Sequence, residues 1–317
     1  MAKSPKIWLT GSTGFIGRPF LKVLKNAQFD VTCITQDAEK AKNSSNDNLL
    51  VHLDYMNTED IKDKVARLGL PDIFIHLGWG DIAHPEFPIH LTEGVQSGKN
   101  LVETFFKLGL KKFIMTGSIS QYGGRIGLLS EDMELEPQAR LTNYAKAKNE
   151  VEKLGLEAAN TYGKTFICVR IPWAFGAGQR QGSLINDLFA AHLKGTSVSL
   201  SPCEHYRDFI HMVDVVEGLK RICAVDESGI INLGSGKYVQ VKDYVTEFWR
   251  KLGGDMDKLK FGARTLHPGE PDQPKSYFDL TRLKRLTQWQ PALSLEEGIM
   301  KTIEDLYNEK SAGAIVT

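Results

Sequence analysis

Short apolar runs alternate with longer amphipathic stretches over the first half of the chain. The runs hold consecutive apolar residues, as strands buried on both faces of a sheet do. The stretches between them repeat apolar positions every three or four residues, which is the period of a helix. The runs lie at 6–10, 30–35, 72–78, 112–118 and 165–172, and the helical stretches at 20–27, 59–69, 101–109 and 143–163. This alternation predicts successive βαβ units and an α/β fold with a doubly wound parallel sheet.

Composition narrows the class of partner. Lys+Arg and Asp+Glu are equal at 39 each, so we expect no nucleic-acid partner, because binding that backbone needs an extended basic surface. The four cysteines, Cys33, Cys168, Cys203 and Cys223, are far apart in the sequence. Their spacing predicts neither a redox motif nor a metal site, and we expect no metal. No segment has the length of a membrane span, so we expect a cytoplasmic protein without a membrane partner.

Three glycines follow the first apolar run in the sequence GSTGFIGR, before a helix predicted to begin near Phe15. Gly11 permits a tight turn, Gly14 lets the backbone approach a pyrophosphate, and Gly17 allows the helix to pack closely on the strand. The N-terminus of that helix favours the anionic phosphates. The turn therefore predicts a dinucleotide site in a Rossmann-type sheet. The candidate cofactor-binding residues here are Gly11, Thr13, Gly14, Phe15, Ile16, Gly17 and Arg18.

The alternation loosens after Pro172, where Gly and Pro become more frequent in AFGAGQRQG and LHPGEPDQP. We therefore assign residues 1–172 to the dinucleotide-binding domain, with 205–240 returning to it. A smaller C-terminal α/β region, made of 173–204 and 241–317, is expected to bind the substrate.

Tyr144 and Lys148 are four positions apart in a stretch with strong helix propensity, so they share one helix face. An ammonium beside a phenol would lower the tyrosine pKa and ease proton exchange near neutrality. A surface Tyr and Lys pair is the structural alternative. The preceding segment, KFIMTGSISQYGG, places Ser118 at the end of a predicted strand, where ligands bind in such sheets, and Ser120 is the competing serine.

The GxxGxxG spacing resembles that of the short-chain dehydrogenase/reductase superfamily, and further motifs resemble its extended branch, the NAD-dependent epimerase/dehydratase family. The matching segments are Phe74–Gly78, Asp54 in HLDYMN, Arg207–His211 with Asp214, Asn232–Gly236 and Trp289–Gly298. Five motifs in the family's order cover the chain nearly end to end.

The resemblance implies roles for several residues. Ser118, Tyr144 and Lys148 would be catalytic, and Tyr144 and Lys148 would also contact the cofactor. The strand 74–78, with Leu77, would lie beside the cofactor, and Asp54 would contact its adenine. Arg207 would contact the diphosphate of a nucleotide sugar.

Two departures from the family pattern narrow the chemistry. In the family that this chain resembles, sugar 4,6-dehydratases have the motif Thr-Asp-Glu-x-Tyr-Gly in the catalytic turn. This chain has Ser-Ile-Ser-Gln-Tyr-Gly there, at 118–123. Loss of water needs an acid to protonate the leaving hydroxyl, so these residues argue against a dehydratase. Trp79 and Trp173 stand where relatives have smaller or amide residues. We count both, with Ser118, Ser120 and Arg207, as candidate substrate-binding residues, and core packing is the alternative for each tryptophan.

The end of the second predicted strand bears on the cofactor. Relatives that retain NAD usually carry an acid there, whereas this chain reads Thr35-Gln36-Asp37, with Arg18, Lys40 and Lys42 expected nearby. A neutral strand end beside basic residues accommodates the 2′-phosphate of NADP. We therefore expect NADP, and Asp37 keeps NAD as the alternative.

These features predict an NADPH-dependent reductase of a nucleotide-linked 4-keto-6-deoxyhexose. An NAD-dependent nucleotide-sugar C4 epimerase is the alternative, and a non-catalytic NAD(P)-binding sensor is a third hypothesis that the presence of Tyr144 and Lys148 weakens. Relatives commonly dimerise through two helices per subunit, so we also expect a homodimer formed by the helices that contain 101–109 and Tyr144.

Overall fold

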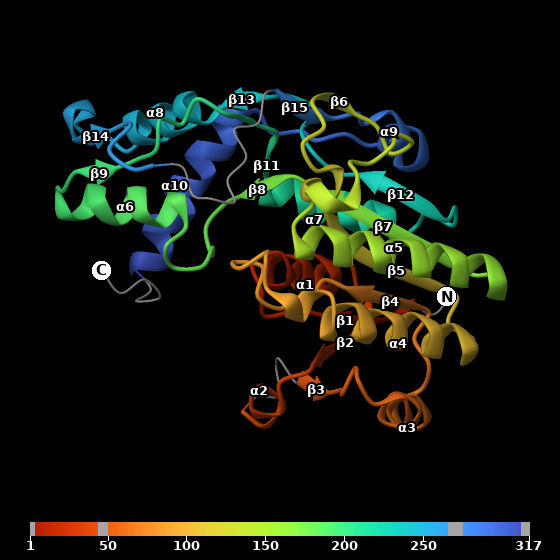
Figure 1. Ribbon diagram of the computed structural model, residues 1–317. Helices are drawn as coiled ribbons and strands as arrows, with labels where there is room; N and C mark the ends of the chain where they lie inside the picture. Colours follow the sequence, from red (N-terminus) through yellow and green to blue (C-terminus); the bar gives the residue numbers. More distant parts are fainter. Residues whose placement is uncertain (1–3, 44–49, 266–274, 312–317) are drawn as a thin grey trace.

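The computed structural model describes residues 4–43, 50–265 and 275–311, and its centre is a seven-stranded sheet (Figure 1). Every strand pair in this sheet is parallel, in the order β12-β7-β5-β4-β1-β2-β3. The strands are β1 (Lys6–Thr10), β2 (Asp30–Thr35), β3 (Leu50–His52), β4 (Ile73–His76), β5 (Lys112–Ser118), β7 (Thr165–Ile171) and β12 (Gly229–Asn232). From β1 the chain adds β2 and β3 on one side, and it then adds β4, β5, β7 and β12 on the other side. The strand order therefore reverses at the boundary between β1 and β4. The predicted Rossmann-type doubly wound fold is confirmed.

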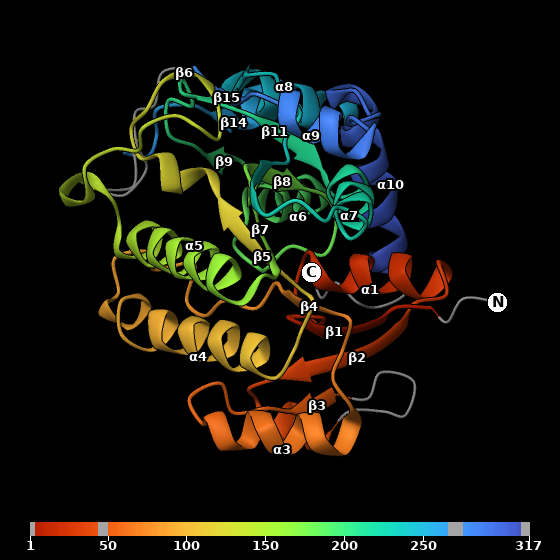
Figure 2. The same ribbon diagram turned by 90° about the vertical axis from the view of Figure 1, so that its right-hand side faces the viewer.

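One face of the sheet carries a row of large aromatic side chains. Trp8, Phe74, Phe113 and Phe166 are paired in register across four neighbouring strands, and each is buried. The helices α3 (Thr58–Leu68), α4 (Glu93–Lys107) and α5 (Asn143–Tyr162) cover this face. Figure 2 shows α4 and α5 side by side, on the opposite side of the sheet from α1 (Gly17–Asn26).

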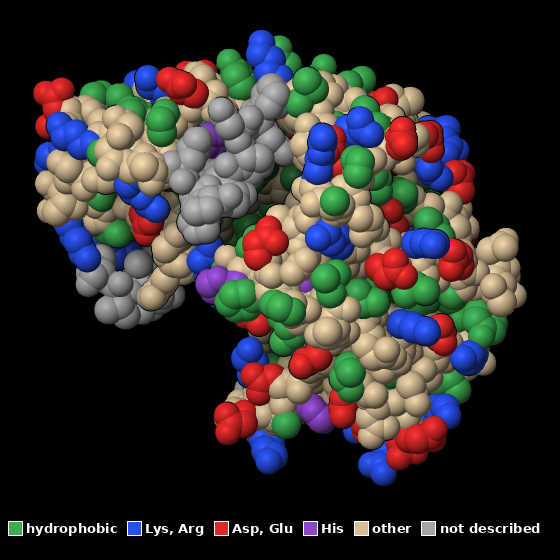
Figure 3. Space-filling model, in the orientation of Figure 1, with side chains coloured by type: hydrophobic (Ala, Val, Ile, Leu, Met, Phe, Trp, Pro, Cys, Tyr) green, Lys and Arg blue, Asp and Glu red, His purple; other side chains and the backbone are tan. Residues whose placement is uncertain are grey.

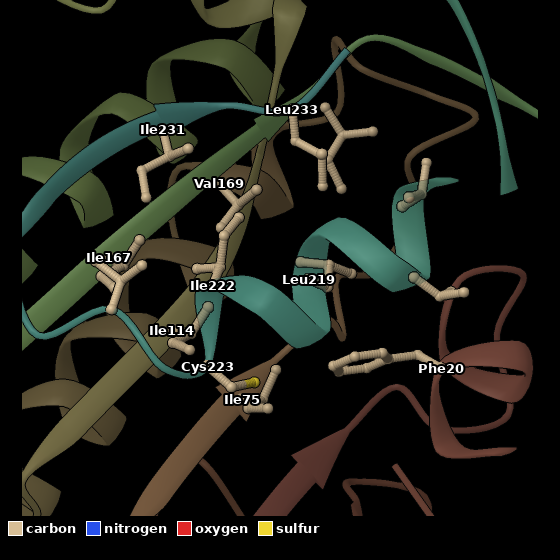
Figure 4. Packing of buried hydrophobic residues seen from close by; sticks show 14 of the residues in the cluster. Phe20, Ile75, Ile114, Ile167, Val169, Leu219, Ile222, Cys223, Ile231 and Leu233 are labelled. Carbon is tan, nitrogen blue, oxygen red and sulfur yellow. The ribbon is translucent and has the colours of Figure 1, made fainter. Parts of the chain in front are cut away.

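The other face is aliphatic, because alternate residues of the same strands point to it. Ile75, Ile114, Ile167 and Ile231 pack there against α1 and α7 (Met212–Ile222) (Figure 4). The two faces therefore bury the continuous apolar runs that the sequence shows. Burial on both sides is what fixes this sheet at the centre of the molecule.

A second body of structure is formed by α6 (Leu184–Lys194), α8 (Val241–Lys251) and α10 (Leu295–Ser311), which enclose their own apolar cluster. In Figure 1 these helices lie to the upper left of the sheet. Short strand pairs lie within this region or connect it to the rest of the chain. They are β8 (Trp173–Phe175) with β11 (Phe209–His211), β9 (Val198–Ser199) with β14 (Leu259–Lys260), β10 (Tyr206–Arg207) with β13 (Val239–Gln240), and β6 (Gly127–Leu129) with β15 (Ser276–Phe278). The remaining helices are α2 (Ala38–Lys42) and α9 (Thr281–Thr287).

Some boundaries differ from those predicted. α1 begins at Gly17 rather than near Phe15, because the backbone at 12–16 is still in the glycine turn. α4 begins at Glu93, eight residues before the predicted start, in a stretch whose first turns carry few apolar residues. β3 and β12 were not predicted, since each has only three or four residues.

Candidate active site

The glycine turn lies at the carboxyl end of β1, where two of its three glycines are required by the protein itself. Gly11 has a φ of 70°, and a Cβ there would lie 2.8 Å from the Gly78 nitrogen. A Cβ on Gly17 would lie 1.9 Å from the Gly11 carbonyl oxygen. Gly14 has only that same oxygen nearby, at 3.2 Å. Gly11 therefore allows the turn to lie against the residues after β4, and Gly17 allows α1 to lie against the turn after β1. Gly14 keeps the outer side of the turn open.

Thr10 and His76 hold the ends of β1 and β4 together at this turn, and neither is among the predicted site residues. The Gly78 N–H donates to Thr10 Oγ1 at 3.0 Å, and that hydroxyl lies 2.8 Å from His76 Nδ1. Burial lowers the pKa of His76 to about 3. The imidazole is therefore neutral and shares a hydrogen bond with the Thr10 hydroxyl. A Thr at a strand end and a His in IFIH give no sequence signal beyond their burial.

A cavity of about 330 Å³ opens at the carboxyl ends of β1, β2 and β4. Its lining includes Gly11, Thr13, Thr35, Asp37 and Tyr55. This is the point where the strand order reverses, the usual position of a dinucleotide in such sheets. α1 begins beside it and has no acidic residue in its first turn. The narrow glycine backbone and the helix N-terminus suit a pyrophosphate, so these residues fit a nicotinamide dinucleotide.

Other predicted cofactor residues have different surroundings. Phe15, Ile16 and Leu77 pack against the aliphatic core. The Asp54 carboxylate accepts a hydrogen bond from the Met56 N–H at 2.9 Å. This bond stabilises the turn that precedes α3. The cavity at this point is lined by the neighbouring Tyr55 and Met56.

Arg18 does not lie near the end of β2 as predicted. Its guanidinium donates to the Gly178 carbonyl at 3.1 Å and lines a second, larger cavity. Asp37, at the end of β2, caps α2 by accepting from the Lys40 N–H, and its carboxylate pairs with the Lys40 ammonium at 3.4 Å. Lys40 is therefore the basic residue beside the ribose end of the cofactor cavity, and the expectation for Arg18 was wrong because α1 directs it toward the C-terminal region.

Ser118, Tyr144 and Lys148 come together between the end of β5 and the first turns of α5. Ser118 makes a side-chain hydrogen bond with Tyr144, and its Oγ lies 2.6 Å from Ser120 Oγ. Lys148 Nζ donates to the Thr116 carbonyl at 2.7 Å and lies 5.8 Å from the centre of the Tyr144 ring. The structure thus brings all three predicted catalytic residues together.

The electrostatics of this group differ from the prediction. Burial raises the pKa of Tyr144 to about 12, opposed by the hydrogen bond with Ser118. Burial also lowers the pKa of Lys148 to about 7. The expected lowering of the tyrosine pKa by the ammonium is absent here. The reason is that Lys148 is itself desolvated and directs its nitrogen to a backbone carbonyl.

Trp79 packs directly on this group. Its ring centre lies 3.9 Å from Lys148 Nζ and 6.0 Å from the centre of the Tyr144 ring. Its indole N–H donates to His90 Nδ1 at 3.1 Å, and His90 Nε2 lies 3.1 Å from the His84 carbonyl oxygen. Trp79 lines the smaller cavity rather than the larger one. In this structure it adjoins the candidate cofactor site, not the candidate substrate site.

The larger cavity, of about 860 Å³, lies between the sheet and the C-terminal region. Figure 3 shows the hollow between these two parts of the molecule. Trp173 is 46% exposed there, and the Arg207 guanidinium lies 4.8 Å from its ring centre. Arg180 and Arg264, which the sequence motifs did not indicate, also line the cavity. Thr13 lines both cavities, so both reach the glycine turn.

A family model described as the NAD dependent epimerase/dehydratase family matches residues 7–234. The chain belongs to this family. It is 26% identical to the UDP-glucuronate 4-epimerase of Thermodesulfobacterium geofontis, over 93% of this chain and 94% of that protein. The resemblance drawn from the sequence motifs is confirmed.

Among the described residues, no helix is both long and apolar enough to cross a membrane.

Two solved structures share the fold of this family member. The UDP-glucose 4-epimerase of Thermotoga maritima, solved with UDP-glucose, has a TM-score of 0.83 and 23% identity, covering 97% of this chain and 99% of that one. The dTDP-glucose 4,6-dehydratase of Bacillus anthracis, solved with NAD, has a TM-score of 0.81 and 18% identity, covering 97% and 98%. At these identities the likeness concerns the fold.

Proposed function

We propose that this chain reduces a nucleotide-linked 4-keto-6-deoxyhexose with NADPH. The observation that carries the proposal is the Ser118, Tyr144 and Lys148 group, on which Trp79 packs where it lines the cavity at the glycine turn. The turn at Ile119–Tyr122 contains no carboxylate that could protonate a leaving hydroxyl, which favours ketone reduction over dehydration.

Each residue of the group has a defined task. Bound nicotinamide supplies the hydride, which adds to the ketone carbon. Tyr144 gives its phenolic proton to the oxygen that becomes the new hydroxyl, and Ser118 donates a hydrogen bond to that oxygen. Lys148 holds the cofactor ribose and, when protonated, favours the phenolate that remains on Tyr144.

Recognition is assigned to the larger cavity. Arg207, only 2% exposed and stacked on Trp173, would anchor the diphosphate by charge-assisted hydrogen bonds. Trp173 would pack against the sugar, and Ser120 would assist Ser118. Residues 173–204 and 241–317 are accordingly proposed as the substrate-binding region, with 1–172 and 205–240 as the cofactor domain.

The choice of NADPH rests on the end of β2. Thr35 is neutral, and the carboxylate of Asp37 is engaged with Lys40 and the start of α2. The Lys40 ammonium would meet a 2′-phosphate. Thr35→Asp should shift preference toward NADH, because an acid there accepts hydrogen bonds from the ribose hydroxyls and repels the phosphate.

An NAD-dependent C4 epimerase is the second candidate. It is favoured by the relative named UDP-glucuronate 4-epimerase, which matches nearly the whole chain, and by NAD in a structure of the same fold. The same three residues would move the proton at the sugar oxygen, while bound NAD would supply the hydride acceptor for oxidation and the hydride donor for the return step.

We also propose a homodimer formed through α4 and α5.

The deciding experiment follows nicotinamide absorbance and sugar products with purified protein, NADPH or NADH, and a panel of nucleotide-linked 4-keto-6-deoxy sugars together with nucleotide-linked 4-hydroxy sugars. Stoichiometric loss of NADPH absorbance with one sugar is the expected result. Interconversion of sugar epimers without net loss, by protein that retains NAD, would replace the reductase with the epimerase. No conversion of any nucleotide sugar would overturn both.

A further inference from the structure

A group of buried polar side chains lies behind the turn that carries Ser118, and the proposed chemistry does not use it. The group contains Gln121, Tyr122, Asn149, Glu152 and Arg170, each at most 9% exposed. Polar groups are costly to bury unless they are hydrogen-bonded. Their partners therefore reveal which parts of the site are held together most firmly.

Gln121 is at the centre of this group and is fully buried. Its Oε1 accepts a hydrogen bond from the backbone N–H of Ser118 at 2.9 Å. Its Nε2 donates to Asn149 Oδ1 at 2.9 Å and to Glu152 Oε2 at 3.0 Å. Asn149 and Glu152 lie on α5, so one amide joins the end of β5 to the helix that carries Tyr144.

The acceptor on α5 is itself fixed from the other side. Arg170 of β7 donates to both oxygens of Glu152, from Nη2 at 2.6 Å and from Nε at 3.1 Å. The guanidinium also lies 4.5 Å from the centre of the Tyr122 ring. A buried, two-point ion pair leaves Glu152 a single orientation, and that orientation presents an oxygen to Gln121.

Gly117 shows how closely the strand is fitted around this amide. A Cβ at Gly117 would lie 2.4 Å from Gln121 Oε1 and 2.9 Å from Cys168 Sγ. Thr116, on one side of Gly117, accepts the Lys148 hydrogen bond at its carbonyl oxygen. Ser118, on the other side, donates its N–H to Gln121. α5 is therefore attached to the end of β5 at two points, on either side of Gly117.

We propose that Gln121 is a positioning residue, which fixes the Ser118 hydroxyl relative to Tyr144 by tying the Ser118 backbone to α5. The proposal rests on the proposed function, in which Ser118 donates to the reacting oxygen. Glutamine suits the position because it offers an acceptor toward Ser118 and two donors toward α5. Leucine offers neither, and glutamate would place a second carboxylate against Glu152.

The test is a double-mutant cycle in the full-length protein, combining Gln121→Leu with Ser118→Ala. Gln121→Leu alone should lower kcat about 10- to 100-fold, because a small misplacement of a reacting group has effects of that size. KM and the Kd for the cofactor should stay within about twofold. With Ser118 already replaced, the same change should cost less than about twofold, since its effect passes through Ser118. Equal losses in both backgrounds would overturn the proposal.

Two further measurements separate positioning from general stability. Thr302→Val removes a buried hydrogen bond to the Gly298 carbonyl in α10 and should leave kcat unchanged. In Gln121→Glu, kcat should rise as the pH falls relative to wild type, because a protonated carboxyl both accepts from Ser118 and donates to Glu152. A pH profile parallel to that of wild type would count against positioning, even if the leucine variant does not fold.

Hydrogen exchange at the Ser118 amide gives a readout that needs no substrate. Exchange should be at least about tenfold faster in the folded Gln121→Leu variant, because the amide loses its acceptor. Unchanged exchange would refute the link. Failure of the proposed function is distinguishable, since it appears as a wild-type protein without nucleotide-sugar turnover, or as turnover that survives Tyr144→Phe.

Discussion

The seven-stranded sheet and the wall of the larger cavity build their parts of the candidate site in different ways. At the sheet, Gly11 and Ser118 stand at the ends of strands that are buried on both sides, and Tyr144 stands at the start of the long helix α5. At the larger cavity, Trp173 and Arg207 come from strands of three and two residues. Rigid elements hold catalytic groups to small tolerances, whereas short strands and loops vary easily and suit recognition. Changes in the first region should therefore affect kcat or folding, and changes in the second should affect KM.

Tyr144→Phe has the largest expected effect on turnover. Removal of the proton donor should lower kcat by about 10²- to 10⁴-fold, with the cofactor Kd within about twofold of wild type. Steady-state kinetics and cofactor titration measure the two quantities. Tyr162→Phe, at the other end of α5, is the matched control and should keep full activity. Substantial turnover by the Tyr144 variant would show that the assignment of the proton donor to Tyr144 is wrong.

Arg207→Ala is the corresponding change at the larger cavity. Loss of a buried, charged contact should raise the KM for the nucleotide sugar about 10- to 100-fold, with little change in cofactor binding. Arg221→Ala, at an exposed position on α7, controls for the loss of a positive charge. If kcat fell and KM did not, the assignment of recognition to this region would be wrong.

Gly17→Ala tests the close approach of α1 to β1. A Cβ would meet the Gly11 carbonyl oxygen at 1.9 Å, so the free energy of unfolding should fall by about 1–3 kcal/mol. Gly14→Ala, where that oxygen is 3.2 Å away, should destabilise the protein less. It should instead weaken cofactor binding. Urea denaturation and cofactor titration of the pair would show whether the two glycines really have different tasks.

The pH dependence of stability gives the most gradual effect. The pKa of Lys148 is about 7 in the folded protein, against 10.5 without burial. Between pH 7 and 10.5 the unfolded chain therefore binds more protons at this group, and the free energy of unfolding rises with pH across that window. Lys148→Met should lose this rise, whereas Lys146→Met on the same helix serves as the control. An identical pH profile for the Lys148 variant and wild type would contradict the burial of a titrating lysine.

Much of the site near the sheet could be predicted because its residues are local in the sequence. The glycine turn spans seven residues, and Tyr144 and Lys148 are one helical turn apart, so spacing alone brings each set together. Arg18 was misplaced because a long side chain at a helix start can point to either of two cavities. His90 and Gln121 gave no signal, because no motif marks their contacts: His90 bonds to Trp79 within one loop segment, and Gln121 bonds to Asn149 and Glu152 only once α5 packs on β5.

The sequence by itself determined the parallel α/β fold, the family and the set of residues gathered at the ends of β1 and β5. Continuous apolar runs require burial on both faces, and glycines at fixed spacing permit only a tight turn against a helix. Only the tertiary structure decided how these residues are held and charged. Burial raises the pKa of Tyr144 and lowers that of Lys148, and the Gln121 amide links β5 to α5. Desolvation and such links depend on neighbours that are far away in the chain.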